Sequence, residues 1–275
     1  MTRADPNLGR LVVGQPSPHA LATVVRSWLL AETGHLREAR VALDEGVELA
    51  RALDDAETLG WGLGFYARLA WLSGEPQDSL ARAREGAEIA ERLGSSFSLL
   101  IAYQSLCAAH AARGEWDEAR RAAERALGVI EDAHTSFQAE PGVLTALAEA
   151  RVGGGDHAAA VDAAKRAIDL ARRRNTRALE TEGCVVLAHA LRGRDGTAAN
   201  DRIAALLADA NALATETGAR SHLPRIHVEL AELARLNGDH ERDVRELREA
   251  HRLYEEIGAT RHAARIATQL AALRV

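Results

Sequence analysis

Apolar residues recur along this chain at spacings of three and four, which is the repeat of an amphipathic helix. The stripes come in pairs separated by a glycine: Leu99, Tyr103 and Leu106 precede Gly114, and a second stripe begins at Ala119. Glycine adopts the left-handed conformation that ends many helices, and an acidic residue just after it favours the start of the next helix. The pattern therefore predicts an all-helical chain made of helix–turn–helix units.

The stripes place these units at residues 18–275, after an irregular segment at residues 1–17. The first helices are expected at 18–33, 57–73, 97–113, 138–153, 177–192 and 221–237, and the second helices at 36–53, 77–93, 117–133, 158–173, 198–217 and 241–257. A last helix at 260–273 is expected to cover the final unit with an apolar stripe and to turn its arginines to water. The stripe is Ala263, Ile266, Ala267, Leu270 and Leu273, and the arginines are Arg261, Arg265 and Arg274.

The turn glycines repeat at a nearly constant interval. Gly34, Gly74, Gly114, Gly155 and Gly238 follow one another at spacings of 40, 40, 41 and 83 residues. The long interval has room for two units, and the segment 192–196 is a degenerate copy of the turn. Single hairpins of this kind cannot bury both faces, so neighbours stack into one continuous core. We therefore expect a solenoid of about six units with a C-terminal capping helix.

The small residues of each unit resemble those of tetratricopeptide (TPR) repeats. The fourth unit, for example, has Leu147-Ala148 in its first helix, then Gly155, Ala160 and Ala167. The unit of about 40 residues and the ending 245–260 resemble the C-terminal arrays of bacterial maltose-regulator-type (LuxR-family) transcription activators and of cyclase-like signal-transduction ATPases. This resemblance implies a right-handed superhelix and a role in signalling or transcription regulation.

Charge and composition narrow the classes of partner. The net charge is −6, so nothing indicates binding to a nucleic-acid backbone. No apolar run has the length of a membrane span or of a secretory signal, which predicts a cytoplasmic protein that does not enter a membrane. The two cysteines lie inside apolar stripes and are expected to be buried thiols.

No motif in the sequence predicts catalysis or a cofactor. The cluster Gly153–Gly155 is followed by Asp156 and ends a helix, so we interpret it as a turn and not as a phosphate-binding loop. His-Glu-x-x-His and Cys-x-x-Cys are absent, which argues against a metal site. Cys107 and His110 lie at helical spacing, and a packed thiol is the favoured interpretation over a nucleophile. We expect a protein that is not an enzyme.

The candidate binding face is the concave side, which the first helices should line. Its N-terminal part is aromatic and its C-terminal part is charged. The predicted residues are Trp28, Trp61, Phe65, Arg68, Trp71 and Gln104 in the first part, and Glu149, Glu182, His189, Arg192, Arg225, Glu229, Glu232 and Arg235 in the second. The tryptophans have two interpretations: they fill the space between helices, or they line a groove for a ligand.

The sequence leaves three functional hypotheses. The first is a non-catalytic scaffold that binds a protein or peptide partner in the concave groove. The second is a sensor domain for a small-molecule effector, as the resemblance to maltose-regulator-type arrays implies. The third is an enzyme whose site lies in the solenoid cavity. The sequence also leaves open whether the chain forms a homodimer.

Overall fold

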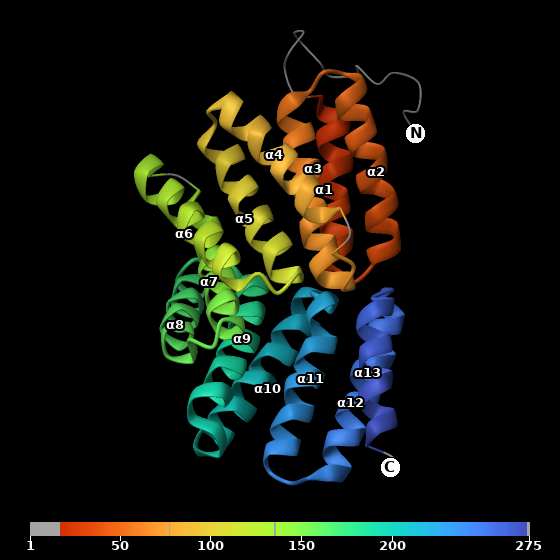
Figure 1. Ribbon diagram of the computed structural model, residues 1–275, viewed down its shortest axis with the longest axis vertical. Helices are drawn as coiled ribbons and strands as arrows, with labels where there is room; N and C mark the ends of the chain where they lie inside the picture. Colours follow the sequence, from red (N-terminus) through yellow and green to blue (C-terminus); the bar gives the residue numbers. More distant parts are fainter. Residues whose placement is uncertain (1–16, 77, 135, 274–275) are drawn as a thin grey trace.

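A computed structural model describes residues 17–76, 78–134 and 136–273 of the chain (Figure 1). The described residues form thirteen α-helices, and short 3₁₀ turns precede three of them. The expected irregular segment 1–17 lies, apart from Ser17, outside the described residues. The helices are α1 Pro18–Glu32, α2 Leu36–Ala52, α3 Ala56–Ser73, α4 Ser79–Leu93, α5 Ser96–Ala112, α6 Trp116–Ala133, α7 Glu140–Gly153, α8 His157–Arg173, α9 Arg177–Asp195, α10 Asn200–Thr217, α11 Leu223–Leu236, α12 His240–Ile257 and α13 Thr260–Ala272.

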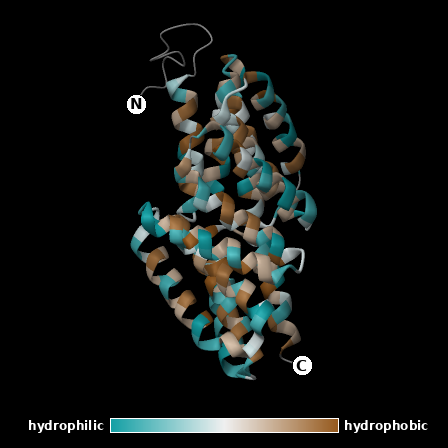
Figure 2. Cartoon of the chain, turned by 90° about the vertical axis from the view of Figure 1, so that its left-hand side faces the viewer, coloured by the Kyte–Doolittle hydropathy of each residue, from teal (hydrophilic) through white to brown (hydrophobic). Residues whose placement is uncertain are grey.

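The helices stack as six antiparallel pairs followed by α13, which confirms the expected TPR-like solenoid. The first helices of successive pairs, α1, α3, α5, α7, α9 and α11, contact one another and form an inner layer. Each second helix packs against its own first helix and against the first helix of the next pair. Apolar and polar positions alternate around each helix (Figure 2), as the stripes predicted.

The turns follow the glycines that mark the repeat. The five turn glycines have φ between 72° and 84°, a conformation that a side chain disfavours. Gly74, for example, ends α3, and its N–H donates to the carbonyl of Ala70. Short side chains also allow the helices to approach closely, because a Cβ on Gly64 of α3 would lie 2.3 Å from Oγ of Ser105 on α5.

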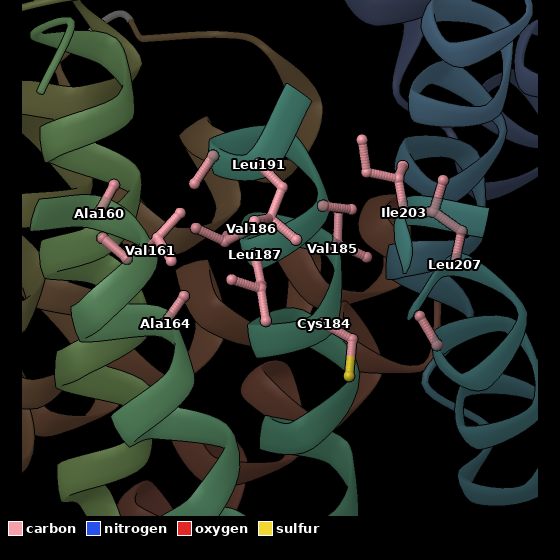
Figure 3. Packing of buried hydrophobic residues seen from close by; sticks show 14 of the residues in the cluster. Ala160, Val161, Ala164, Cys184, Val185, Val186, Leu187, Leu191, Ile203 and Leu207 are labelled. Atoms are coloured by element: carbon pink, nitrogen blue, oxygen red, sulfur yellow. The ribbon is translucent and has the colours of Figure 1, made fainter. Parts of the chain in front are cut away.

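Small and β-branched side chains fill the core between the pairs. In one cluster Val161 of α8 faces Val186 and Leu191 of α9, and Ile203 of α10 completes it from the next layer (Figure 3). Cys184 lies in the same cluster and is fully buried, as expected for a packed thiol. Each Å² of apolar surface that this packing removes from water stabilises the stack by about 25 cal/mol.

The two ends of the solenoid meet, which the sequence did not predict. One core cluster joins Leu36 and Leu43 of α2 to Ile257 of α12 and Ile266 of α13. A Cβ on Gly34 would lie 2.9 Å from Cγ2 of Ile257, so the turn after α1 rests directly on the end of α12. In Figure 1 the helices α1 to α5 accordingly stand end-on above α11 to α13. We call this junction of the first and last units the seam.

The last helix, α13, packs against both the last unit and the seam. Ala263 and Ile266 are buried, and α13 contacts both α12 and α3. Nε2 of His262 lies 3.1 Å from the carbonyl oxygen of Trp71 at the end of α3. The expected stripe is wrong at one position, because Ala267 is exposed. Arg261 and Arg265 face water as expected, and Arg274 lies outside the described residues.

Candidate functional site

Charged side chains of the inner layer meet one another on the inner side of the solenoid. Arg68 of α3 donates from Nε and Nη2 to the two carboxylate oxygens of Glu32 on α1, at 2.9 and 3.2 Å. Its Nη1 donates to Oε1 of Glu182 on α9 at 3.0 Å. Nε2 of His222, in the 3₁₀ turn before α11, lies 3.5 Å from Glu32. We call Glu32, Arg68, Glu182 and His222 the inner ionic cluster; it links the N-terminal and C-terminal halves.

The charges of the cluster stabilise one another. Burial alone raises the pKa of the Glu32 carboxyl, but Arg68 and His222 outweigh it and hold that pKa well below its usual value. The pKa of Glu182 is lowered in the same way, by Arg68 and His222 against its burial. The two carboxylates in turn raise the pKa of Arg68, although its burial acts in the opposite direction. All three side chains are therefore charged at neutral pH.

Trp71 lies beside this cluster between two arginines. The guanidinium carbons of Arg68 and Arg225 lie 5.0 and 4.4 Å from the centre of its ring, a cation–π arrangement. Arg225 of α11 also donates from Nη2 to both carboxylate oxygens of Glu149 on α7, at 2.9 and 2.8 Å. Its Nη1 is buried and has no hydrogen-bond partner within the described part of the chain. Trp71 thus fills the space between the two halves of the solenoid.

The remaining charged candidates form a second network on α9 and α11. Glu229, which is 7% exposed, accepts from Arg192 at 3.1 Å and lies 3.3 Å from Nδ1 of His189. Glu232 lies 3.8 Å from Arg192 and accepts from Arg235 at 2.8 Å. The structure therefore brings the charged residues of the predicted binding face together, and they form ion pairs with one another. Whether they also bind a ligand stays a prediction.

Some residues of these networks escaped the sequence reasoning. Asp243 stands where the repeat pattern expects alanine, and its buried carboxylate accepts from Nε and Nη2 of Arg235, both at 3.0 Å. This departure from the repeat pattern was the sequence signal that could have marked Asp243 as part of the network. The sequence held no signal for Glu32 or His222. Glu32 is the last residue of its helix, and His222 lies in a short turn that the apolar pattern does not reveal.

The aromatic candidates separate into distinct roles. Nε1 of Trp61 donates to Oγ of Ser98 at 3.1 Å, and the Trp61 and Phe97 rings are nearly perpendicular with their centres 5.0 Å apart, so Trp61 fills the space between α3 and α5. Phe65 packs partly buried against the core at the seam. Gln104 is half-buried on α5. Trp28 differs from all of these, because it is 42% exposed.

Trp116 is the fourth tryptophan, and it lies one residue before the helix that the sequence predicts at 117–133. In the structure it is the first residue of α6, and its ring lies against Gly153 at the end of α7. A Cβ on Gly153 would lie 2.2 Å from that ring, so only glycine allows this contact. The indole therefore joins the third and fourth units of the stack.

The side chains considered for catalysis have structural contacts. Burial, with a smaller contribution from Glu149, raises the pKa of Cys107 to about 12, so its thiolate is not populated at neutral pH. Nδ1 of His110 is engaged by Glu115 at 2.7 Å. Across the described ranges no group of three or more metal-binding side chains occurs. None of the described helices combines the length and apolar content needed to cross a bilayer.

Known structures share this architecture. No protein-family model and no curated protein sequence matches the chain. A Rap protein complexed with Competence and Sporulation Factor aligns over 94% of this chain and 71% of its own, with a TM-score of 0.65 and 12% identity. Aspartyl phosphate phosphatase F from Bacillus subtilis aligns over 92% and 69%, with a TM-score of 0.58 and 11% identity.

A third structure belongs to a signal-transduction ATPase. The STAND protein with a tetratricopeptide repeat sensor from Pyrococcus horikoshii aligns over 91% of this chain and 42% of its own, with a TM-score of 0.54 and 13% identity. Likeness at this level of identity establishes a fold and leaves function open. The narrower resemblance to maltose-regulator-type activators stays a prediction. Together with the paired helices and their regular turn glycines, these structures show that the chain is a TPR-like helical repeat protein.

Proposed function

We propose that the chain is a non-catalytic binding module that holds an amphipathic helix of a partner polypeptide against α1. The observation that carries this proposal is an exposed apolar stripe. Val25, Trp28 and Leu29 are 37%, 42% and 52% exposed, and their spacing places them on one face of α1. Exposed apolar clusters of this kind mark interaction surfaces, and tryptophan is the residue type most enriched at their energetic centres.

The stacking rule of the fold supports a helix as the occupant. Each later first helix, from α3 to α11, is packed against the second helix of the preceding unit. Among the described elements α1 contacts mainly α2, α3 and the 3₁₀ turn before α11, and no described second helix of a preceding unit takes the corresponding place. The buried face of α1, which includes Ala20, Val24 and Ala31, is turned to those neighbours. A partner helix on the other face would repeat the packing that the rest of the solenoid uses.

Charge around the stripe favours an acidic partner. The carboxylate of α1, Glu32, is held by Arg68, whereas Arg26 is exposed beside the stripe. A partner helix with apolar residues at positions i, i+3 and i+4 and flanking acidic residues would complement this surface. The inner side of the solenoid is a less favourable place for such a segment, because the inner ionic cluster occupies it.

A displayed library of amphipathic peptides, selected on the full chain, tests this proposal. Selected peptides should carry the apolar spacing with acidic flanks and should protect the amides of α1 from hydrogen exchange. Trp28→Ser should weaken their binding about tenfold or more. Leu236→Ser is the matched control, because Leu236 on α11 is exposed to a similar extent, 40% against 42% for Trp28.

Two results would contradict the proposal. Peptides that bind the Trp28→Ser and Leu236→Ser variants equally would place the site elsewhere. A concentration-dependent dimer that Trp28→Ser abolishes, with no peptide selected, would show that a second copy of the chain and not a foreign helix covers the stripe.

A further inference from the structure

The seam contains a pocket of about 350 Å³ whose walls come from both ends of the chain. Helices α2, α3 and α4 supply one side, and the turn between α12 and α13 supplies the other. The two sides touch, because a Cβ on Gly258 would lie 3.3 Å from Cγ of Arg37. The polar side chains that matter for its chemistry are Arg37, Arg40, Tyr66, Ser73, Arg82 and Thr260.

The arginines around the pocket are not equivalent. Arg40 is paired with Asp44, whose Oδ1 and Oδ2 lie 3.1 and 3.2 Å from its Nε. The hydroxyl of Tyr66 donates to the same carboxylate at 2.5 Å, so Asp44 is occupied. In the part of the chain that the structure describes, no carboxylate oxygen lies within 4.0 Å of a guanidinium nitrogen of Arg37 or Arg82. Arg37, which is exposed, and Arg82, which is half-buried, therefore line this pocket without a carboxylate partner.

The rest of the lining holds these arginines in place without neutralising them. The guanidinium carbon of Arg82 lies 4.1 Å from the centre of the Tyr66 ring, which fixes its position against α3. Glu75 also lines the pocket, but it is exposed, and Thr260 donates to it at 3.4 Å. One exposed carboxylate thus faces two unpaired guanidinium groups, and the pocket keeps an excess of positive charge in a chain whose net charge is −6.

We propose that this seam pocket binds a small ligand that carries a phosphate or carboxylate group. Arg37 and Arg82 would each donate to the anionic group, because a guanidinium offers parallel donors that match carboxylate and phosphate oxygens. Ser73 also lines the pocket, where its hydroxyl donates to the carbonyl of Ala70 at 3.5 Å and accepts from the N–H of Glu75 at 3.3 Å. The volume of about 350 Å³ lies at the small end of the range for small-molecule sites, about 300–1,000 Å³, and so matches a small ligand.

The position of the pocket gives binding a structural consequence. Arg37 and Arg82 belong to the first two units, whereas Gly258 and Thr260 belong to the last. A ligand that contacts both sides binds the closed solenoid better than an open one, and so stabilises the seam by mass action. This inference does not depend on the apolar stripe of α1, which lies on a different surface.

Isothermal titration calorimetry of the full chain with inorganic pyrophosphate and with citrate tests the proposal and separates phosphate from carboxylate ligands. At least one probe should bind, and its Kd should rise about tenfold in Arg82→Gln and in Arg37→Gln, as expected for a lost charge-assisted hydrogen bond. Arg84→Gln is the matched control, because Arg84 lies on the same helix as Arg82, is exposed and does not line the pocket.

Hydrogen exchange adds a readout that does not depend on the variants. Bound probe should slow amide exchange in the turn between α12 and α13 as well as in α2. The proposal is overturned if neither probe binds the folded chain at millimolar concentration. It is equally overturned if Arg84→Gln weakens binding as much as Arg82→Gln, or if exchange slows on one side of the seam alone.

Discussion

Removal of the Arg68 guanidinium should weaken the link between the two halves of the solenoid. Arg68→Ala leaves Glu32 and Glu182, whose side chains are 20% and 14% exposed, without their shared cation. At an effective dielectric constant of about 20, each ion pair contributes about 4 kcal/mol of gross attraction. Removing one partner of a buried pair costs about 3–5 kcal/mol. Because the cluster is partly exposed, we expect a loss of about 3 kcal/mol in the free energy of unfolding.

Urea denaturation followed by circular dichroism measures this loss, with Arg120→Ala as the control. Arg120 pairs with Glu124 at 2.9 Å on α6, but the two side chains are 38% and 42% exposed. An exposed helical pair of this type is worth about 0.3–0.5 kcal/mol. Small-angle scattering should also show a larger radius of gyration for Arg68→Ala, because the pair joins α3 to α9.

Equal losses in Arg68→Ala and Arg120→Ala would refute the reasoning. They would show that the desolvation of the inner ionic cluster cancels its attraction, and that apolar contacts at the seam hold the halves together. A large loss without any change in scattering would show that the two halves stay closed without Arg68, and that the cluster adds stability without deciding the shape.

Three further predictions follow from single contacts. The stabilisation that Glu32 provides at neutral pH should be lost as the pH falls below its ordinary pKa of 4.5, because that pKa is lowered in the folded chain; urea titrations at several pH values measure it. Gly153→Ala should destabilise by about 1–3 kcal/mol because its Cβ meets an indole, whereas Gly128→Ala, with open space around it, should stabilise by up to about 1 kcal/mol in thermal unfolding. Cys107 and Cys184, whose pKa values burial raises to about 12, should resist a thiol reagent at pH near 8 until the chain unfolds; fast labelling would contradict this.

The helices and turns were predictable because their signals are local. The turn glycines at intervals of 40 and 41 residues all adopt positive φ. The errors at helix starts also have local causes. Helix α7 begins at Glu140 and not at residue 138, because a 3₁₀ turn precedes it and Pro141 favours a first-turn position. Helix α4 begins at Ser79 and not at residue 77, because Asp78 has a left-handed backbone.

The candidate site was predictable in its residue types and less so in its contacts. The helical stripe placed Arg68 and Glu182 on the inner side, but their meeting over 114 residues depends on small rotations between units that add up along the solenoid. The summed rotations between units also decide whether other side chains cover a given tryptophan. Trp71 is enclosed by two arginines at the seam, whereas Trp28, which belongs to the same predicted group, is 42% exposed.

The seam changes how the fold can come apart. An open array of repeats can fray one unit at a time from either end, because a terminal unit depends on a single neighbour. Here Leu36 near the start of the chain and Ile257 near its end share one core, so each terminal unit protects the other. Deleting the last pair of helices would therefore loosen the first. Since these contacts join residues more than 200 positions apart, they should form late, and the array should fold more slowly than its local helices alone would suggest.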